Sequence, residues 1–527
     1  MKRYFYKINP LLISTILILL YLFNKSIQFE LNPVYFSVSK YFSKTLTLES
    51  PWFESEEFSF KSFGITHVII GLLFKFFPDY KLIIWEFLPL IIIPCSVFLW
   101  YRTASEFLES KIILFSFLLL NFFYLEPWYL FASQTPRFIF NFIIVPIFLY
   151  SINNFDSVKN NSNKKSLIII MVIGFLIHKL MTLQLFILLF VYSLLKTITL
   201  KNYKFLLEII KVCFITLLLI SPAVFILIKE IICSGVDHSF YNNPIYWTEK
   251  MFYELIPMLK FSKLFDLYYG YKVVIITFLT IPYIFFLKDF LILKASTIII
   301  LTTFLTPLGF CYSIFLTPGV VVETFLAGSV FPVLLTVFVC LEKVLVLDFK
   351  NTILNMVRYL MFFPLFFLYY INIKFIIGLN PSNSESFFDK EVVKYLNDND
   401  VIFSDIKTSS RVPSVSNSKV FIADRCNILE TPKKNLDYAT SFFSQDMINK
   451  DIINKIFFKY KCDKILVYKK HINELNEVSN KHLQLEKYGI VFLKDFETIK
   501  KQVLKITGQS SDYIVVNMPN FIIIERG

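Results

Sequence analysis

Long apolar runs recur along most of this chain and then stop. Leu11–Phe23, Leu82–Trp100 and Phe205–Ile228 approach the roughly 20 residues that a membrane-spanning helix needs. Such runs continue up to Gly378, and beyond it short apolar stretches alternate with polar ones. The pattern predicts a polytopic membrane domain over 1–379 and a smaller domain over 380–527.

The positions of Lys and Arg in the short connectors predict the orientation of the spans. Cytoplasmic connectors carry an excess of these residues, and the N-terminus and the connector at 151–166 are both basic. We therefore expect a multi-pass plasma (inner) membrane protein with a cytoplasmic N-terminus and an external C-terminal domain. About 11 helices satisfy the pattern, near 10–27, 82–100, 111–125, 138–151, 166–178, 179–196, 205–229, 272–287, 290–316, 325–342 and 354–379.

Two segments decide whether the number of spans is odd or even, and so on which side the C-terminal domain lies. Ile65–Phe77 is too short to span, since 13 residues rise only about 20 Å as a helix. We expect it to lie on, or dip into, the outer face. Leu167–Leu195 is predicted to be a hairpin of two short helices that turns at His178 and Lys179. A single helix would place the basic connector at 151–166 outside.

The first external loop, 28–81, is far too polar to cross a bilayer. It interleaves five glutamates with Phe, Tyr and Trp. A short turn would be enough to join the two flanking spans, so a loop of this length is not needed as a connector. We interpret the loop as the lid and acid-bearing wall of a site at the membrane face. The glutamates are Glu30, Glu49, Glu54, Glu56 and Glu57.

Composition supports the membrane assignment and excludes two classes of function. Apolar residues make up 56% of the chain, against about 45–50% in soluble domains. Ten of the 13 net positive charges fall in 1–379, where short basic loops set orientation. No Lys/Arg-rich block with interleaved aromatic residues occurs, so nucleic-acid binding is not expected. The seven cysteines show no C-x-x-C spacing, which argues against a structural zinc site.

The C-terminal domain, 380–527, has the pattern of an α/β fold. Helical spacing in 387–396 and between several later segments accompanies short β-rich runs. No Gly-rich phosphate loop and no G-x-S-x-G sequence is present. The β-rich runs are Val401–Ser404, Lys419–Ala423, Lys464–Tyr468, Ile490–Leu493, Tyr513–Val516 and Phe521–Ile524.

Isolated charges stand beside apolar segments at the expected outer face, where they are costly and tend to be functional. Glu30 lies just beyond the first span, where a carboxylate can deprotonate an acceptor hydroxyl or hold a divalent cation. Glu126 follows the third span, and Arg137 begins the next one. Glu323 is a lone acid beside a later span. Solvation at a helix end would explain Glu30 and Glu126 equally, as would snorkelling of Arg137 to the interface, whereas Glu323 is interpreted as functional.

The pair His178-Lys179 interrupts 31 mostly apolar residues. An unpaired Lys in hydrocarbon costs at least about 2.5–3.5 kcal/mol, so the pair marks either a surface turn or a polar cavity. A Lys ammonium is also a natural partner for phosphate. Acids from the first two external loops and cations from Arg137 and Lys179 suit a lipid-linked phosphate that enters from the bilayer. They suit the lining of a transport path as well.

Four short segments resemble a known family. In Phe29–Phe42 an acid precedes aromatic residues and a helix, and Gly64–Gly71 contains a G-x-x-H apolar helix. Phe175–Lys179 ends a mid-chain helix in His, and Ile402–Ser410 reads strand–Asp–x–x–Thr–Ser. With its many spans and external tail, the chain resembles the GT-C superfamily of integral membrane glycosyltransferases. That superfamily includes oligosaccharyl-, O-mannosyl- and aminoarabinose transferases.

The resemblance implies transfer of a sugar from a polyprenyl-phosphate donor to an acceptor hydroxyl, with inversion, in cell-envelope polysaccharide or glycolipid biosynthesis. The implied partners are that donor, the bilayer, and an acceptor glycan, lipid or protein. A divalent cation is compatible but not required, so the cofactor is unknown. The implied catalytic residues are Glu30 and Glu126, and the implied substrate- and phosphate-binding residues are Arg137, His178, Lys179, His67 and Glu323.

This chain departs from the family at two positions. A lone Glu30 stands where Asp or an Asp-Glu pair is common, and Val322-Glu323-Thr324 replaces a late-span Arg. Two other functions therefore stay open. One is a lipid or polysaccharide transporter, although such proteins more often contain internal repeats, and none is evident here. The other is a non-catalytic member of the same fold.

Overall fold

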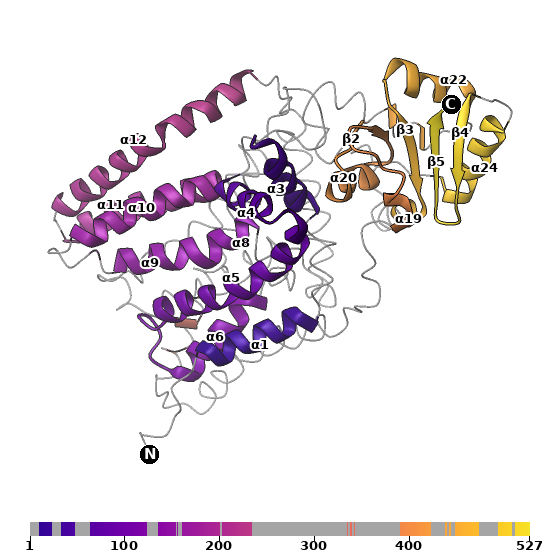
Figure 1. Cartoon of the computed structure of the whole chain (residues 1–527). Helices are drawn as coiled ribbons and strands as arrows, with labels where there is room; N and C mark the ends of the chain where they lie inside the picture. Colours follow the sequence, from indigo (N-terminus) through magenta and orange to yellow (C-terminus); the bar gives the residue numbers. More distant parts are fainter. Residues whose placement is uncertain are drawn as a thin grey trace, which may run out of the picture.

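The structure is a computed structural model, shown in Figure 1. A bundle of helices is followed by a separate mixed sheet with its own helices. The described residues are 10–23, 33–47, 64–123, 135–153, 155, 161–200, 203–233, 335, 338–339, 342, 390–422, 438–439, 442–443, 448–473, 494–508 and 512–527.

Helices are found at the positions of the first seven predicted spans, and that each of them crosses the membrane stays a prediction. Four helical stretches in the described part are long and apolar enough to cross a membrane, as expected of an integral membrane protein. The last four predicted spans lie outside the described residues, except for helical positions at 335, 338–339 and 342. The bundle consists of α1 (Pro10–Phe23), α5 (Lys81–Ala104), α6 (Lys111–Phe123), the continuous run α8 (Pro136–Ile139), η2 (Phe140–Ile144) and α9 (Val145–Asn153), then α10 (Asn161–Ile177), α11 (Lys179–Leu200) and α12 (Tyr203–Cys233).

The predicted hairpin at His178 is confirmed. α10 ends at Ile177 and α11 begins at Lys179. Lys164, near the start of α10, forms an ion pair with Glu208, near the start of α12. Because α11 alone connects α10 to α12, it must run back antiparallel to α10.

Side-chain contacts identify two ends of the bundle. The Tyr21 hydroxyl donates to the Glu86 carbonyl oxygen (2.8 Å), which places the end of α1 beside the start of α5. At the opposite end, the Glu342 carboxylate accepts hydrogen bonds from the backbone N–H groups of Glu109 (3.0 Å) and Ser110. Glu342 therefore lies beside the connector between α5 and α6. Which end faces the cytoplasm stays a prediction.

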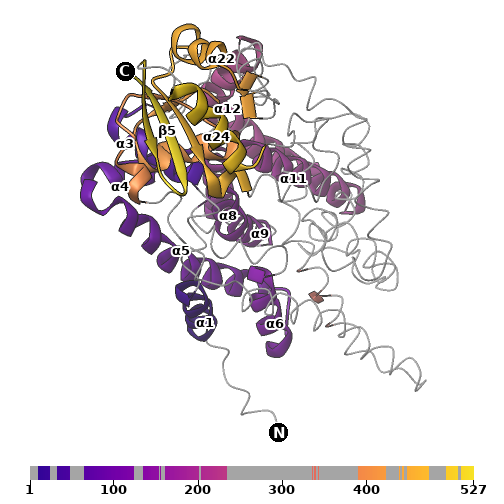
Figure 2. The same cartoon turned by 90° about the vertical axis from the view of Figure 1, so that its right-hand side faces the viewer.

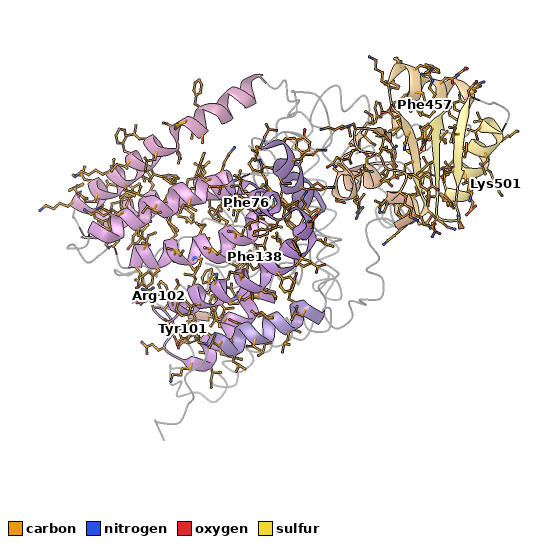
Figure 3. The ribbon with its side chains drawn as sticks, in the orientation of Figure 1. Phe76, Tyr101, Arg102, Phe138, Phe457 and Lys501 are labelled. Carbon is orange, nitrogen blue, oxygen red and sulfur yellow. The ribbon has the colours of Figure 1, made fainter. Side chains whose placement is uncertain are left out.

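Apolar side chains cover much of the outside of the bundle as well as its interior (Figure 3). Phe138 is fully buried between helices, whereas Phe76 is 73% exposed. Exposed Leu and Phe side chains continue along α12, including Phe214 and Leu218. An apolar exterior is stable only in contact with lipid or other apolar groups, in agreement with a membrane protein.

Two helices from the first loop form a layer at one end of the bundle. They are α3 (Pro33–Thr45) and α4 (Ile65–Phe76), the latter followed by the short helix η1 (Pro78–Tyr80). Phe36 of α3 and Phe74 of α4 pack against Trp85 of α5. The expected short helix over 65–77 is therefore confirmed, and α3 joins it to form a pair.

The C-terminal residues form a five-stranded sheet with strand order β2-β1-β3-β5-β4. β1 pairs in parallel with β2 and β3, while β5 runs antiparallel to β3 and β4. The predicted β-rich runs are strands, except that 490–493 lies outside the described residues. The elements are α19 (Lys390–Val393), β1 (Val401–Phe403), α20 (Ile406–Val415), β2 (Lys419–Val420), α22 (Lys450–Asn454), η7 (Lys455–Lys459), β3 (Lys464–Tyr468), α24 (Phe496–Thr507), β4 (Tyr513–Asn517) and β5 (Phe521–Arg526).

The C-terminal domain lies against the first-loop layer rather than against the spanning helices. Figures 1 and 2 place α20 and the sheet on the side of the bundle that carries α3 and α4. Val38 of α3 is 1% exposed and belongs to the same apolar cluster as the strands of the sheet. The first loop and the C-terminal domain therefore lie at the same end of the bundle.

Candidate functional site

Arg137, His178 and Lys179 come together at the end of the bundle that carries α3 and α4. Thr135 caps α8 by accepting a hydrogen bond from the Phe138 N–H (3.4 Å), and a proline follows at the first helical position. Arg137 is thereby held in the first turn of that helix. Its positive charge acts on His178, whose ring also meets that of Phe140 edge-on at 6.3 Å.

His178 contributes to the start of α11. Its Nδ1 accepts a hydrogen bond from the Met181 backbone N–H (3.5 Å). The lone pair of Nδ1 is then in use, so the neutral imidazole carries its proton on Nε2. That N–H is a donor suited to an anionic oxygen.

The two cations oppose the helix macrodipole. Arg137 is the second residue of α8, and Lys179 is the first residue of α11. The N-terminal end of a helix is positive, and a cation there is unfavourable by roughly 0.3–1 kcal/mol. An anion would relieve both positions, because two helix N-termini and two side-chain cations would then act on it together. The arrangement suits a phosphate group.

The start of α4 lies directly on the α10–α11 turn. A Cβ atom on Gly64 would come within 2.5 Å of the Ile177 carbonyl oxygen, and still closer to that of Leu176. Only glycine fits this approach without displacing backbone. The contact brings the first turn of α4, with His67, beside the turn that carries His178 and Lys179.

His67 is buried between α3 and α4. Its ring stacks on Tyr35 (5.5 Å between centroids, 7° between planes), and Nδ1 lies 3.2 Å from the Ser39 hydroxyl. Burial lowers the pKa of His67 to about 3, against a smaller opposite effect of a hydrogen bond to the Tyr35 backbone. The imidazole is therefore neutral at physiological pH. The contacts with Ser39 and Tyr35 hold α3 on α4, and the phosphate-binding role that the resemblance implies stays a prediction.

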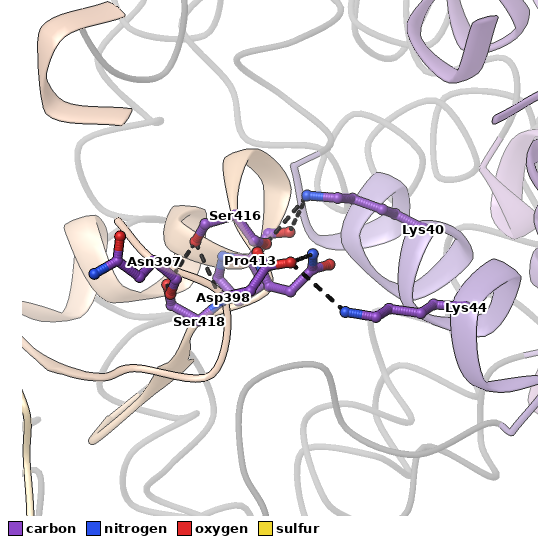
Figure 4. Close-up of polar contacts among 8 residues, drawn as sticks. Lys40, Lys44, Asn397, Asp398, Pro413, Ser416 and Ser418 are labelled. Carbon is purple, nitrogen blue, oxygen red and sulfur yellow. Dashed lines mark hydrogen bonds and ion pairs between the residues drawn. The ribbon is translucent and has the colours of Figure 1, made fainter. Parts of the chain in front are cut away.

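The face of α3 opposite α4 binds the C-terminal domain (Figure 4). The Lys40 ammonium donates to the carbonyl oxygens of Pro413 (3.4 Å), Ser414 (3.4 Å) and Ser416 (3.1 Å), where α20 ends. One turn further along α3, Lys44 pairs with Asp398 at 3.7 Å. The hydrogen bonds of Lys40 bridge α3 and the end of α20, so Lys40 connects the first loop to the C-terminal domain.

Tyr41 adds a second contact between α3 and the sheet. The Lys419 ammonium lies 4.4 Å from the centre of the Tyr41 ring and 3.4 Å from its hydroxyl oxygen. Cation–π pairs of this kind contribute about 0.5–1 kcal/mol at exposed sites. The interface thus contains Lys40 and Lys44 from α3 and Lys419 from the C-terminal domain, with Asp398 as the carboxylate that pairs with Lys44.

Lys40 gives the interface a pH dependence. Burial, together with Lys81 and Lys44, lowers the pKa of Lys40 to about 8, and Asp398 acts in the opposite direction. An undocked lysine titrates near 10.4, so the docked state binds fewer protons between these values. Docking is therefore expected to strengthen as pH rises from about 8 to 10 and to be unaffected by this group below 8.

Distances between spin labels on α3 and the C-terminal domain would measure the docked fraction. A fraction that falls over that window would contradict the prediction, and Lys40→Met should abolish the change.

The structure tests only part of the predicted site. Glu30, Glu126 and Glu323 lie outside the described residues, so their roles stay predictions. Arg137 and His178 are brought together, with Lys179 next to His178. Lys40 was not predicted as a functional residue, although Lys40 and Lys44 share one face of a helix at i, i+4 spacing. Asn32-Pro33 before it is also a typical helix start.

The strand–Asp–x–x–Thr–Ser segment has a structural role within the sheet domain. Asp405 caps α20 by accepting a hydrogen bond from the Thr408 N–H (2.9 Å). The Thr408 hydroxyl donates to Asp405 (2.5 Å) and lies 3.0 Å from Nδ1 of His471. All three side chains are buried, so the segment joins the ends of β1 and β3.

Neither sequence comparison assigns a family, and the likeness to solved structures is distant. No protein-family model matches the chain, and no curated protein is similar to it. The structure is similar to the crystal structure of the Archaeoglobus fulgidus oligosaccharyltransferase tethered with an acceptor peptide containing the NVT sequon via a disulfide bond. The match has 11% identity and a TM-score of 0.28, and it covers 98% of this chain and 63% of that one. Values this low assign neither fold nor activity.

Among the residues that the structure describes, no group of three or more His, Cys, Asp or Glu side chains is placed to hold a metal ion. The acids predicted to face the substrate lie outside those residues.

Proposed function

We propose that this protein is a membrane glycosyltransferase that moves a sugar from a polyprenyl-phosphate donor to an acceptor hydroxyl at the outer membrane face. The observation that supports this most is the cationic end of the bundle. Arg137, His178 and Lys179 gather there at two helix N-termini, beside the layer formed by the first loop. A lipid-linked phosphate reaches such a site from the bilayer.

The proposed chemistry uses these groups in complementary roles. The acceptor oxygen forms a bond to the anomeric carbon as the bond from that carbon to the phosphate oxygen breaks. Glu30 takes the acceptor's proton, and polyprenyl phosphate leaves with the electron pair. Arg137, Lys179 and the Nε2–H of His178 stabilise the negative charge that grows on the leaving phosphate. Glu126 is proposed as a second acid of the site.

Release of polyprenyl phosphate tests the proposal directly. Purified protein in nanodiscs would be supplied with a panel of polyprenyl-phosphate sugars and acceptors. We expect release by the wild type and a loss of about a hundredfold or more in Glu30→Gln, the range of general-base catalysis. Glu54→Gln, in the same loop, is the matched control and should retain activity.

The other outcomes separate the alternatives. If Glu30→Gln releases polyprenyl phosphate as fast as wild type, the protein is still a transferase, but its general base is another residue, with Glu126 and Glu49 as the next candidates. Binding of the lipid without release for any donor would rule out the transferase under these conditions. A transporter or a non-catalytic member of the fold would then be favoured, and a flux assay in sealed vesicles would distinguish these two.

A further inference from the structure

A continuous series of contacts connects the C-terminal domain to the cationic end of the bundle. The sheet domain contacts α3, α3 packs on α4, and α4 begins on the α10–α11 turn. Each of these contacts is a close one between backbone segments or buried side chains. The position of the C-terminal domain is therefore linked mechanically to that of the first-loop layer.

The contact between α3 and the C-terminal domain depends on Lys40. Its three ammonium hydrogens match three carbonyl acceptors, those of Pro413 and Ser414 in the last turn of α20 and that of Ser416 just beyond it. The last carbonyls of a helix generally lack partners within it. Val38 lies two residues earlier and inserts into the apolar core of the sheet domain. The ion pair of Lys44 with Asp398 is 54% exposed on both sides, and such pairs contribute little. The other polar contact across this interface is that of Lys419 with Tyr41.

The contact between α3 and α4 is equally close. A Cβ atom on Gly71 would lie 2.9 Å from the Ser39 carbonyl oxygen and 2.6 Å from the Phe42 ring. Together with the His67–Ser39 contact, this keeps the two helices as one layer. A displacement of α3 therefore moves the whole layer and the chain that enters it. Glu30 precedes the first residue of α3 by only three positions.

We propose that Lys40 is a positioning residue for sugar transfer. By holding the C-terminal domain on α3, it sets the position of α3 and α4 relative to Arg137, His178 and Lys179. Lys40 touches no reacting group in this role. The inference rests on the proposed function, because it concerns the step in which Glu30 acts.

The role predicts a separation of two kinetic effects. Misplacement of a catalytic group lowers turnover by as much as a hundredfold, so Lys40→Met should lower kcat by about tenfold to a hundredfold. Donor affinity should stay within about threefold of wild type, because the cationic end is built from α8, α10 and α11. Lys40→Arg keeps the cation and its donors and should restore most of kcat. Lys44→Met is the matched control and should behave as wild type.

Hydrogen exchange measured without substrate decides whether Lys40 acts through docking. Backbone amides of α3 and of 413–420 should exchange faster in Lys40→Met than in wild type, with the helices of the bundle unchanged. Faster exchange with unaltered kcat would overturn the positioning role. So would a parallel loss of donor affinity and kcat, or exchange that does not change. If wild type releases no polyprenyl phosphate, the function itself fails and the positioning role with it, while the exchange difference still reports docking.

Discussion

Replacing Lys464 by Met is expected to lower the free energy of unfolding of the C-terminal domain by about 3 kcal/mol. Lys464 is 6% exposed at the start of the central strand β3. Its ammonium pairs with Asp400 (3.0 Å) and Glu525 (2.9 Å) and also donates to the Tyr395 carbonyl. Removing it leaves two partly buried carboxylates without their cation, and breaking a buried pair costs about 3–5 kcal/mol.

The size of that effect follows from how many elements Lys464 joins. Glu525 is its direct cross-strand neighbour on β5, and Asp400 precedes β1. Burial alone would lower the pKa of Lys464, but the hydrogen bonds with Glu525 and Asp400 outweigh it and raise the pKa. The stabilisation is therefore complete below about pH 10, the unfolded value, and is lost as pH rises through the folded pKa.

Native-state hydrogen exchange of β3 amides in the full-length protein, over a urea series, measures this loss. Lys469→Met is the matched control. Lys469 lies 3.3 Å from Glu497, and the two side chains are 40% and 55% exposed. We therefore expect the free energy of unfolding to change by less than about 1 kcal/mol. If both variants lose the same free energy of unfolding, the buried ion pairs of Lys464 contribute no more than an exposed pair does.

Replacing Gly64 by Ala should separate α4 from the α10–α11 turn at a cost of about 3 kcal/mol. Overpacking costs typically 1–3 kcal/mol, and here the new methyl would meet two backbone carbonyls, which cannot rotate away. The rate of sugar transfer should fall, because α3 and α4 would shift relative to Arg137, His178 and Lys179. Exchange of α4 amides and the release assay would follow the two effects.

Gly174→Ala provides the control for this substitution. Its Cβ would lie 3.1 Å from Thr182 Oγ1 and 3.2 Å from Ile144 Cγ2. These are side-chain atoms that can shift by a few tenths of an ångström, so the cost should be smaller. A Gly64→Ala protein with unaltered α4 exchange would show that this helix does not depend on the close approach.

Local patterns were sufficient to predict most of the described elements. A long apolar run has few alternatives to a buried or membrane helix, because its backbone must be hydrogen-bonded internally in lipid. That is why the first seven spans fall where helices are found. The break at His178 was also predictable, since a Lys within an apolar run needs a surface or a polar partner.

The candidate site was predicted less completely. Arg137, His178 and Lys179 stood out as lone charges beside apolar segments, and the fold places them at one end. His67 was expected among the phosphate-binding residues, yet it packs between two helices with Ser39 and Tyr35. A histidine within a short apolar helix gives no local signal that distinguishes these two roles. Glu30, Glu126 and Glu323 stay predictions.

By itself, the sequence determined the division into an apolar helical part and an α/β tail, the ends of the early spans, and the charges that suit a phosphate. Each of these is encoded within about 20 neighbouring residues. Only the tertiary structure decided that α3 carries the C-terminal domain and that α4 begins on the α10–α11 turn. Lys40 and its acceptor at Ser416 are 376 positions apart. Neither residue has a sequence neighbour that reveals the other, because a contact between distant segments depends on the packing of every helix and strand between them.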